Sequence, residues 1–362
     1  MSIAFGPERW ERVRRVYGEW WRGELARPIV PVELLGRDPG QPRPAAPLLS
    51  QETCADLSVP VEDLVDRLDW ELSSREFLGD AFPCVRLDSF GPGIAAAFMG
   101  ARLDNLSGRV WFLPPAAQPI EAIHFRYDAD NVWLRRIKAL CRAAMARWQG
   151  QVLVTMPDLG GNLDLLSTFR PSEALPMDLY DRPDEVRRLL WEAHDLWHRF
   201  YRELNDVLQP LNPGYSDWSA IYSDTPSYML QCDFAYMISP AMFDAFVRPE
   251  LEASVRRLSR SFYHLDGRGQ LPHLGSVLSI ERLGGVQWVP GAGAPDTRHW
   301  PEVYGRIAAA GKKAQVWDGL DALDAVIAQT GRAGMFHHGI LTAPRADESL
   351  VRRRLAGYGI EA

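Results

Sequence analysis

The sequence has little of what marks secreted, membrane-spanning or nucleic-acid-binding proteins. Its four cysteines (Cys54, Cys84, Cys141 and Cys232) include no CxxC pair. This pattern is typical of reduced thiols, and it disfavours both a disulfide framework and a cysteine-only zinc site. No run of 18 or more apolar residues is present, which predicts that no segment spans a membrane. The 40 basic and 47 acidic residues give a formal net charge of -7, so a nucleic-acid partner is not expected.

The N-terminal segment, MSIAFGPERWERVRR, also lacks the apolar core of a secretory signal. With 46% hydrophobic and 24% charged residues, the chain of 362 residues has enough apolar material for a large core and an ordinary polar surface. These features together predict a soluble, cytoplasmic protein.

Short β-rich runs alternate with amphipathic stretches along most of the chain. A first helix is expected from Pro7, because Trp10, Val13, Tyr17 and Trp20 recur at helical spacing. Strands are expected at 29–32, 84–87, 110–113, 152–156, 219–222, 229–234, 262–265, 285–289, 314–317 and 334–338, and the clearest later helix at 183–204.

This alternation predicts a parallel sheet covered by helices. The number of segments favours a closed (β/α)8 barrel, or TIM barrel, over an open doubly wound sheet, and no GxGxxG motif follows a strand. We therefore expect a single α/β TIM-barrel domain over residues 1–362, with an N-terminal helical extension at about 1–26. In such a barrel the active-site side chains lie where strands end.

One candidate site is the segment SFYHLDG at residues 261–267. His264 and Asp266 lie two positions apart on an expected strand, so they project from the same face, and Gly267 begins the loop at the barrel mouth. The pair fits a metal site or an acid and base. The alternative is that Asp266 caps the following turn while His264 satisfies a buried carbonyl.

The last expected strand ends in two adjacent histidines, one of which should face inward. If that residue is His338, it meets His264 and Asp266 across the mouth. Two histidines and one carboxylate suit zinc or another first-row divalent ion. His337 is then assigned to substrate binding. The alternative is that both histidines are simply a polar strand end.

Other polar residues also end expected strands. Asp88 precedes a Gly-Pro-Gly turn, and it fits either stabilisation of developing positive charge or an Asx-type turn. Asp158 opens a glycine-rich loop that fits a substrate contact but not a phosphate loop, since no GKS or GKT follows. The remaining candidates for a small-molecule pocket are aromatic and polar residues near strand ends: Trp218, Tyr222, Gln231, Asp233 and Trp288.

Several segments resemble the uroporphyrinogen decarboxylase superfamily. They are 239–250 (SPAMFDAFVRPE), similar to its SPxxFxxFVxP helix start; 178–183 (DLYDRP), similar to its dlydxPe helix start; 263–267 (YHLDG) through 285–288 (GVQW), similar to its HxCG…Gxdxi segment; and 336–340 (FHHGI), similar to its GHG or GCG strand end. The resemblance covers roughly residues 80–360 and implies a TIM barrel.

The superfamily contains two activities. One is metal-free decarboxylation of uroporphyrinogen, and the other is zinc-assisted methyl transfer between a corrinoid protein and an acceptor such as a thiol. The methyltransferases hold zinc with a His-x-Cys pair and a later Cys, positions that the resemblance assigns to His264, Asp266 and His338. Oxygen and nitrogen ligands make a harder site than thiolates, which favours an oxygen- or nitrogen-bearing substrate.

The decarboxylases offer a different correspondence. Asp88 matches by position the aspartate that contacts pyrrole nitrogens, and His338 matches the GHG histidine. The arginine-rich RQAGRYLPEY segment of the decarboxylases is missing, and residues 27–34 (RPIVPVEL) stand in its place. A substrate with eight carboxylates needs such cations.

We therefore expect a metal-dependent, methyltransferase-like enzyme that acts on a small molecule, with zinc or another divalent metal. The resemblance implies cobalamin carried by a corrinoid protein partner, and a homodimer, which is common in the family. The second hypothesis is a metal-free decarboxylase or lyase in which Asp88 and His338 are catalytic. The third is a non-catalytic small-molecule or corrinoid-handling protein.

Overall fold

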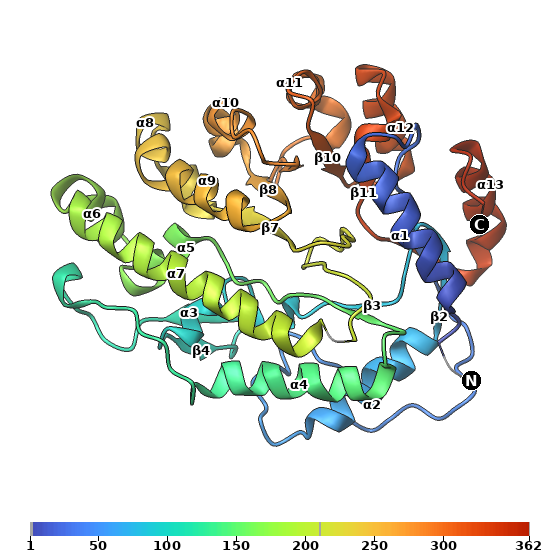
Figure 1. Ribbon diagram of the computed structural model, residues 1–362, viewed down its shortest axis with the longest axis horizontal. Coiled ribbons are helices and arrows are strands. Elements are labelled where there is room, and N and C mark those ends of the chain that lie inside the picture. The colour runs from blue at the N-terminus through green and yellow to red at the C-terminus, as the bar shows by residue number, and fades with distance from the viewer. Residues whose placement is uncertain (1–2, 210, 362) are drawn as a thin grey trace.

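The computed structural model describes residues 3–209 and 211–361. It is a mixed α/β structure in which helices lie around the outside of parallel strands (Figure 1). The largest sheet has five parallel strands in the order β11-β10-β9-β8-β7. These strands are β7 (Ser227–Gln231), β8 (Arg260–Asp266), β9 (Gly285–Val289), β10 (Lys313–Val316) and β11 (Phe336–His338). Most of their residues are buried, as expected for a parallel sheet enclosed on both faces.

The remaining strands form three smaller sheets. They are β1 (Pro31–Leu35) between β12 (Leu341–Pro344) and β2 (Arg75–Gly79), the parallel pair β3 (Cys84–Val85) and β6 (Leu153–Val154), and the antiparallel pair β4 (Arg102–Asp104) and β5 (Trp111–Leu113). Two backbone hydrogen bonds join Ile29 to β11, at Phe336 O (3.0 Å) and His338 N (2.9 Å). The strands of the described residues are thus divided among four sheets.

The helices occupy the stretches between strands. They are α1 (Pro7–Arg22), α2 (Val61–Ser73), α3 (Ala95–Phe98), α4 (Val132–Trp148), α5 (Asn162–Phe169), α6 (Ala174–Asp181), α7 (Pro183–Leu208), α8 (Pro240–Met242), α9 (Arg248–Arg257), α10 (Leu274–Leu278), α11 (Pro301–Ala309), α12 (Leu320–Thr330) and α13 (Glu348–Gly357). Across the described ranges, none of them combines the length and the apolar character that a bilayer crossing requires.

The first helix forms where its apolar spacing predicted. Its buried side, which includes Trp10, Tyr17 and Trp20, faces the protein core. The rings of Tyr17 and Trp20 lie with their centroids 5.8 and 5.7 Å from that of His337. Helix α1 therefore packs against the strand that carries the two histidines rather than extending away from the domain.

Two expected strands take other forms. Residues 219–222 lie in a loop, because Ala220 adopts a positive φ of 59° and only a single bridge, between Tyr215 and Ser223, pairs the two sides. Residues 110–113 contain a strand, but β5 belongs to the antiparallel hairpin with β4 and not to the parallel core. Both segments were predicted from local β propensity, which does not report whether a partner strand is available.

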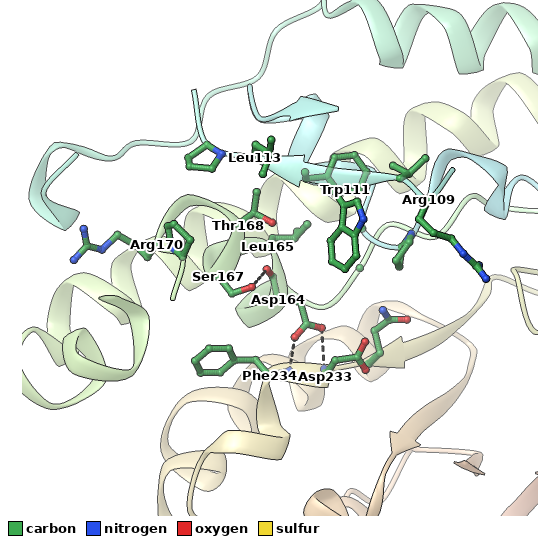
Figure 2. Close-up of a pocket in the computed structure, with 18 of the residues that line it drawn as sticks. Arg109, Trp111, Leu113, Asp164, Leu165, Ser167, Thr168, Arg170, Asp233 and Phe234 are labelled. Carbon is green, nitrogen blue, oxygen red and sulfur yellow. Dashed lines mark hydrogen bonds between the residues drawn. The ribbon is translucent and has the colours of Figure 1, made fainter. Parts of the chain in front are cut away.

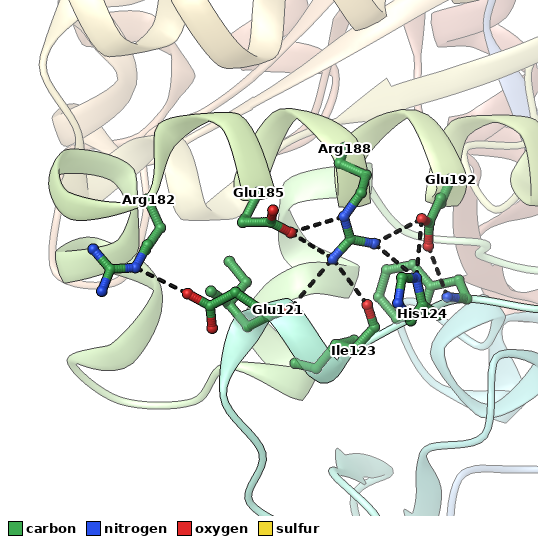
Figure 3. Close-up of polar contacts among 9 residues, drawn as sticks. Glu121, Ile123, His124, Arg182, Glu185, Arg188 and Glu192 are labelled. Atoms are coloured by element: carbon green, nitrogen blue, oxygen red, sulfur yellow. Dashed lines mark hydrogen bonds and ion pairs between the residues drawn. The ribbon is translucent and has the colours of Figure 1, made fainter.

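One arginine fastens the loop before α4 to the long helix α7. Arg188 donates to Glu185 and Glu192 on its own helix and to the carbonyls of Ile120 and Ile123 in the loop (Figure 3). The planar guanidinium has enough donors for all four partners. This contact fixes the chain between the β4–β5 hairpin and α4.

Candidate functional site

Three side chains that fit a metal site converge beside the ends of β7 and β8. One ligand atom from each of Asp233, His264 and Asp266 lies within 4.8 Å of the other two. Around a tetrahedral zinc ion with bonds of about 2.0–2.2 Å, ligand atoms lie roughly 3.3 Å apart. Side-chain movements of no more than about 1.5 Å would therefore bring the three ligand atoms to the spacing of a zinc site.

Strand geometry explains this convergence. His264 and Asp266 are alternate residues of β8, so they share one face. In the pairing of β7 with β8, Gln231 lies opposite His264, and two residues later the chain starts the short helix η3 (Asp233–Met237). Asp233 thus follows directly after β7, at the level at which β8 presents its histidine and aspartate.

Asp233 also lines a large pocket. The pocket has a volume of about 930 Å³ and lies between the β4–β5 hairpin, α5, and the end of β7 with η3 (Figure 2). Trp111 points from the hairpin toward Asp164 and Asp233, and its side of the pocket also carries Arg109. A carboxylate wall thus faces a wall that bears an indole and a guanidinium.

Asp164 fixes the backbone that carries Asp233. Its two carboxylate oxygens accept hydrogen bonds from the backbone amides of Asp233 (3.0 Å) and Phe234 (2.7 Å). Gly161, at the start of α5, leaves room for this contact, because a Cβ there would lie 2.1 Å from the carbonyl oxygen of Gln231. The start of η3 is therefore held against α5, and Asp233 is held with it.

The electrostatics of this region favour a bound cation. Loss of hydration raises the pKa of Asp233; the neighbouring His264 lowers this pKa, while Asp266 raises it. Burial, and then the charge of Asp233, raise the pKa of Asp164. Burial raises the pKa of Asp158 to about 7, although Gly160 donates a backbone hydrogen bond to its carboxylate. A cation near these carboxylates would offset the cost of their ionisation.

The imidazole of His264 has defined neighbours on its other sides. Its Nδ1 is hydrogen-bonded to Oε1 of Gln287 on β9, and the ring of Trp218 meets it edge to face at a centroid distance of 5.1 Å. A metal-binding histidine usually has its second ring nitrogen engaged in this way. The contacts therefore fit a ligand role for the opposite nitrogen, Nε2.

From Gln287 a line of hydrogen bonds continues through the buried interior. Nε2 of Gln287 donates to Oε1 of Gln315 (2.5 Å), and Nε2 of Gln315 lies 3.3 Å from Nδ1 of His337. His337 in turn contacts the hydroxyl of Tyr17 (3.3 Å). Burial is the main cause that lowers the pKa of His337 to about 3, so this ring is neutral at pH 7. The structure thus places His337 inside the core, not at the substrate side to which the sequence assigned it.

The third predicted ligand lies elsewhere. His338 is 2% exposed, its Nδ1 is hydrogen-bonded to the carbonyl of Gly339 at 2.6 Å, and its Nε2 has no partner among the described groups. Its ligand atoms are not part of the group formed by Asp233, His264 and Asp266. Asp233, expected as a substrate contact, occupies the place foreseen for His338. The cause is strand order: β7 neighbours β8, whereas β9 and β10 separate β8 from β11.

The other predicted substrate contacts divide into two groups. Gln231 lines the pocket, and its Oε1 has no hydrogen-bond partner in the described chain. Trp288 and Tyr222 are 0% and 1% exposed, and the Tyr222 hydroxyl donates to the carbonyl of Pro213. These two aromatic side chains are core residues, which corrects their assignment to the pocket wall.

Two further predicted residues lie outside the lining of this pocket. Asp88 is half-buried in a 3-10 turn, η1 (Asp88–Phe90), and Asp158 is buried with its carboxylate turned back to its own loop at Gly160. Neither is among the residues that line the pocket. The Asx-type turn considered for Asp88 instead forms at Asp158.

Sequence reasoning missed four residues that shape this region. Arg109 and Trp111 reach the pocket from a hairpin that no local pattern marks as functional. Gln287 and Gln315 did carry a signal, because each is a buried amide directly flanked by apolar residues of its strand. A buried amide requires hydrogen-bond partners, so such residues indicate a polar network inside the core.

Comparison with known proteins informs the fold. No protein-family model and no curated protein sequence matches the chain. Among solved structures, a methyltransferase from Methanosarcina mazei superposes with a TM-score of 0.60 at 12% sequence identity, covering 96% of this chain and 99% of that one. The two proteins share a fold.

Proposed function

We propose that this protein is a metal-dependent, methyltransferase-like enzyme whose site is formed by Asp233, His264 and Asp266. The observation that carries the proposal is the convergence of these ligand atoms within 4.8 Å, next to a pocket of about 930 Å³. The fold shared with a methyltransferase supports the reaction class. The proposal includes a single (β/α)8 barrel over the whole chain and membership of the uroporphyrinogen decarboxylase superfamily, for which the sequence resemblance is the support.

One nitrogen and two carboxylate ligands suit zinc or another divalent first-row ion. Bound there, the ion would act as a Lewis acid toward a heteroatom of the substrate. The protein's own groups do the rest: Asp164 holds the backbone of Asp233, and Trp218 packs on His264. The exposed indole of Trp111 offers a flat contact for a small molecule.

The pocket chemistry suggests the kind of substrate. Arg109 is exposed on the hairpin, and within the described residues its guanidinium makes no ion pair. It lines the same pocket as Trp111 and Asp233, and its side chain extends outward at one edge of that pocket (Figure 2). A small molecule with an anionic group near Arg109 and an oxygen or nitrogen near Asp233 would fit both walls. We propose that its methyl partner is cobalamin on a corrinoid protein, as the sequence resemblance implies.

Zinc binding tests the ligand set. We expect Asp233→Asn, His264→Gln and Asp266→Asn each to weaken zinc affinity by more than about 100-fold, since loss even of a residue that only orients a ligand costs 10–100-fold. His338→Gln is the matched control and should stay within about threefold of wild type. Titration calorimetry with a competing chelator measures these affinities. Absence of stoichiometric zinc in the wild-type protein, or full affinity in His264→Gln, would overturn the proposal.

Methyl transfer tests the reaction class. The zinc-loaded enzyme is mixed with methylcobalamin and a panel of thiol, amine and phenol acceptors, and cob(I)alamin is followed by its absorbance. We expect turnover that a chelator abolishes. Decarboxylation of a carboxylate substrate that persists in the presence of the chelator and is lost in Asp88→Asn would instead support the metal-free lyase. Ligand binding without turnover would support a non-catalytic protein.

A further inference from the structure

A backbone carbonyl deep in the core is connected to the candidate metal ligand His264 by two glutamine side chains. The carbonyl oxygen of Ser219 accepts from Nε2 of Gln315 (2.9 Å), Oε1 of Gln315 accepts from Nε2 of Gln287 (2.5 Å), and Oε1 of Gln287 contacts Nδ1 of His264. Ser219, Gln287 and Gln315 are each no more than 1% exposed. No solvent-facing group therefore competes for these bonds.

The direction of every bond in this line follows from its first member. A backbone carbonyl can only accept, so Gln315 must turn its NH₂ group toward Ser219 and its oxygen toward Gln287. Gln287 must then present its NH₂ group to Gln315 and its oxygen to His264. An oxygen opposite Nδ1 requires a proton on Nδ1, because two acceptors facing each other inside the core would leave both unsatisfied.

A second branch satisfies the remaining donor. The other hydrogen of the Gln315 NH₂ group points to Nδ1 of His337, 3.3 Å away, which accepts it. His337 then carries its proton on Nε2 and donates to the hydroxyl of Tyr17, whose own hydrogen reaches the carbonyl of Asp80 (3.4 Å). The two histidines are therefore expected in opposite tautomers.

We infer that the carbonyl of Ser219, acting through Gln315 and Gln287, holds His264 in the tautomer protonated on Nδ1 and so reserves the Nε2 lone pair for a cation. This inference rests on the proposed metal site and names two positioning residues for it. If both amides were reversed, Nδ1 of His264 would accept and Nε2 would carry the proton, which would block coordination. The two glutamines thus hold His264 in the tautomer that can bind a metal ion before any ion is present.

Nitrogen NMR reads the tautomers without metal or activity. The protein is labelled with ¹⁵N-histidine, its spectra are recorded at pH 8 without zinc, and resonances are assigned with His264→Gln and His337→Gln. We expect the wild type to show the proton on Nδ1 of His264 and on Nε2 of His337. A proton on Nε2 of His264 would overturn the inference, and the tautomers themselves are read from the wild-type protein.

Two variants then break the line at different points. Gln287→Met and Gln315→Met should each produce a mixture of tautomers at His264 and weaken zinc binding 10- to 100-fold. Gln270→Met is the matched control, since Gln270 is also a fully buried amide, hydrogen-bonded to Tyr263 and outside the line. It should change neither reading.

The outcomes separate the two proposals. If Gln315→Met folds and leaves both the His264 tautomer and the zinc affinity unchanged, the inference is wrong. If the tautomers behave as expected but the wild-type protein binds no zinc, the control of His264 stands and the proposed metal site fails. An equal loss of zinc affinity in Gln270→Met would also count against the inference, because it would indicate a general effect of core destabilisation.

Discussion

Asp217 is a buried carboxylate outside the pocket whose removal should destabilise the elements that carry the site. It is 4% exposed and accepts three hydrogen bonds: from the amide and the hydroxyl of Ser219 (2.8 and 2.6 Å) and from the amide of Met229 on β7 (2.7 Å). It therefore ties the loop that carries Trp218 to the strand that leads to Asp233. The prediction concerns Asp217→Ala.

The magnitude follows from the donors left behind. Two buried backbone amides lose their acceptor, at about 1–3 kcal/mol each, while the serine hydroxyl can rotate to another partner. Burial raises the pKa of Asp217, so removing the carboxylate also relieves some desolvation. The net loss should be about 3 kcal/mol of unfolding free energy. Asp217→Asn keeps one acceptor oxygen and should lose about half as much.

Calorimetric melting measures the effect. In a chain of this size a loss of about 3 kcal/mol should lower Tm by roughly 4 °C. Asp224→Ala is the control, because Asp224 lies in the same loop but is half-exposed, and its ion pair with Arg260 is a partly exposed contact worth at most about 1 kcal/mol. If Asp217→Ala melts within 1 °C of wild type, or no lower than Asp224→Ala, the reasoning from orphaned amides is refuted.

Two further predictions concern stability. Arg188→Ala should destabilise by about 1–2 kcal/mol, since it removes two partly exposed ion pairs and two hydrogen bonds to the carbonyls of Ile120 and Ile123; urea unfolding measures this, with the more exposed Arg15→Ala as control. Burial is the main cause that lowers the pKa of His198 to about 2. Below pH 6.5, His198 is therefore protonated in the unfolded state but stays neutral in the folded state, which lowers the free energy of unfolding as the pH falls. His198→Gln should reduce this loss by about 1.4 kcal/mol per pH unit between pH 6 and 4.

Each of these predictions has a clear contrary result. Equal urea midpoints for Arg188→Ala and Arg15→Ala would mean that the loop before α4 does not depend on that guanidinium. Parallel stability curves for wild type and His198→Gln from pH 7 to 4 would mean that His198 accepts a proton in the folded protein.

Part of the site was determined by the sequence alone. His264 and Asp266 share a face because side chains alternate along any strand, so residues two positions apart point the same way. This alternation can be recognised from neighbouring residues in the sequence. Helix α7 follows in the same way from its 3.6-residue apolar spacing, and it forms at Pro183–Leu208 against a predicted 183–204. Local periodicity of this kind does not depend on which segments later become neighbours.

The third ligand and the residues that orient the first were decided only by the tertiary structure. Whether Asp233 or His338 joins His264 depends on strand order, and β7 is the strand beside β8. The amides of Gln287 and Gln315 acquire their direction from one carbonyl, that of Ser219, in a loop that the sequence pattern had predicted as a strand. Side chains distant in the sequence meet only when packing fixes strand order and register, because a hydrogen bond extends barely 3 Å.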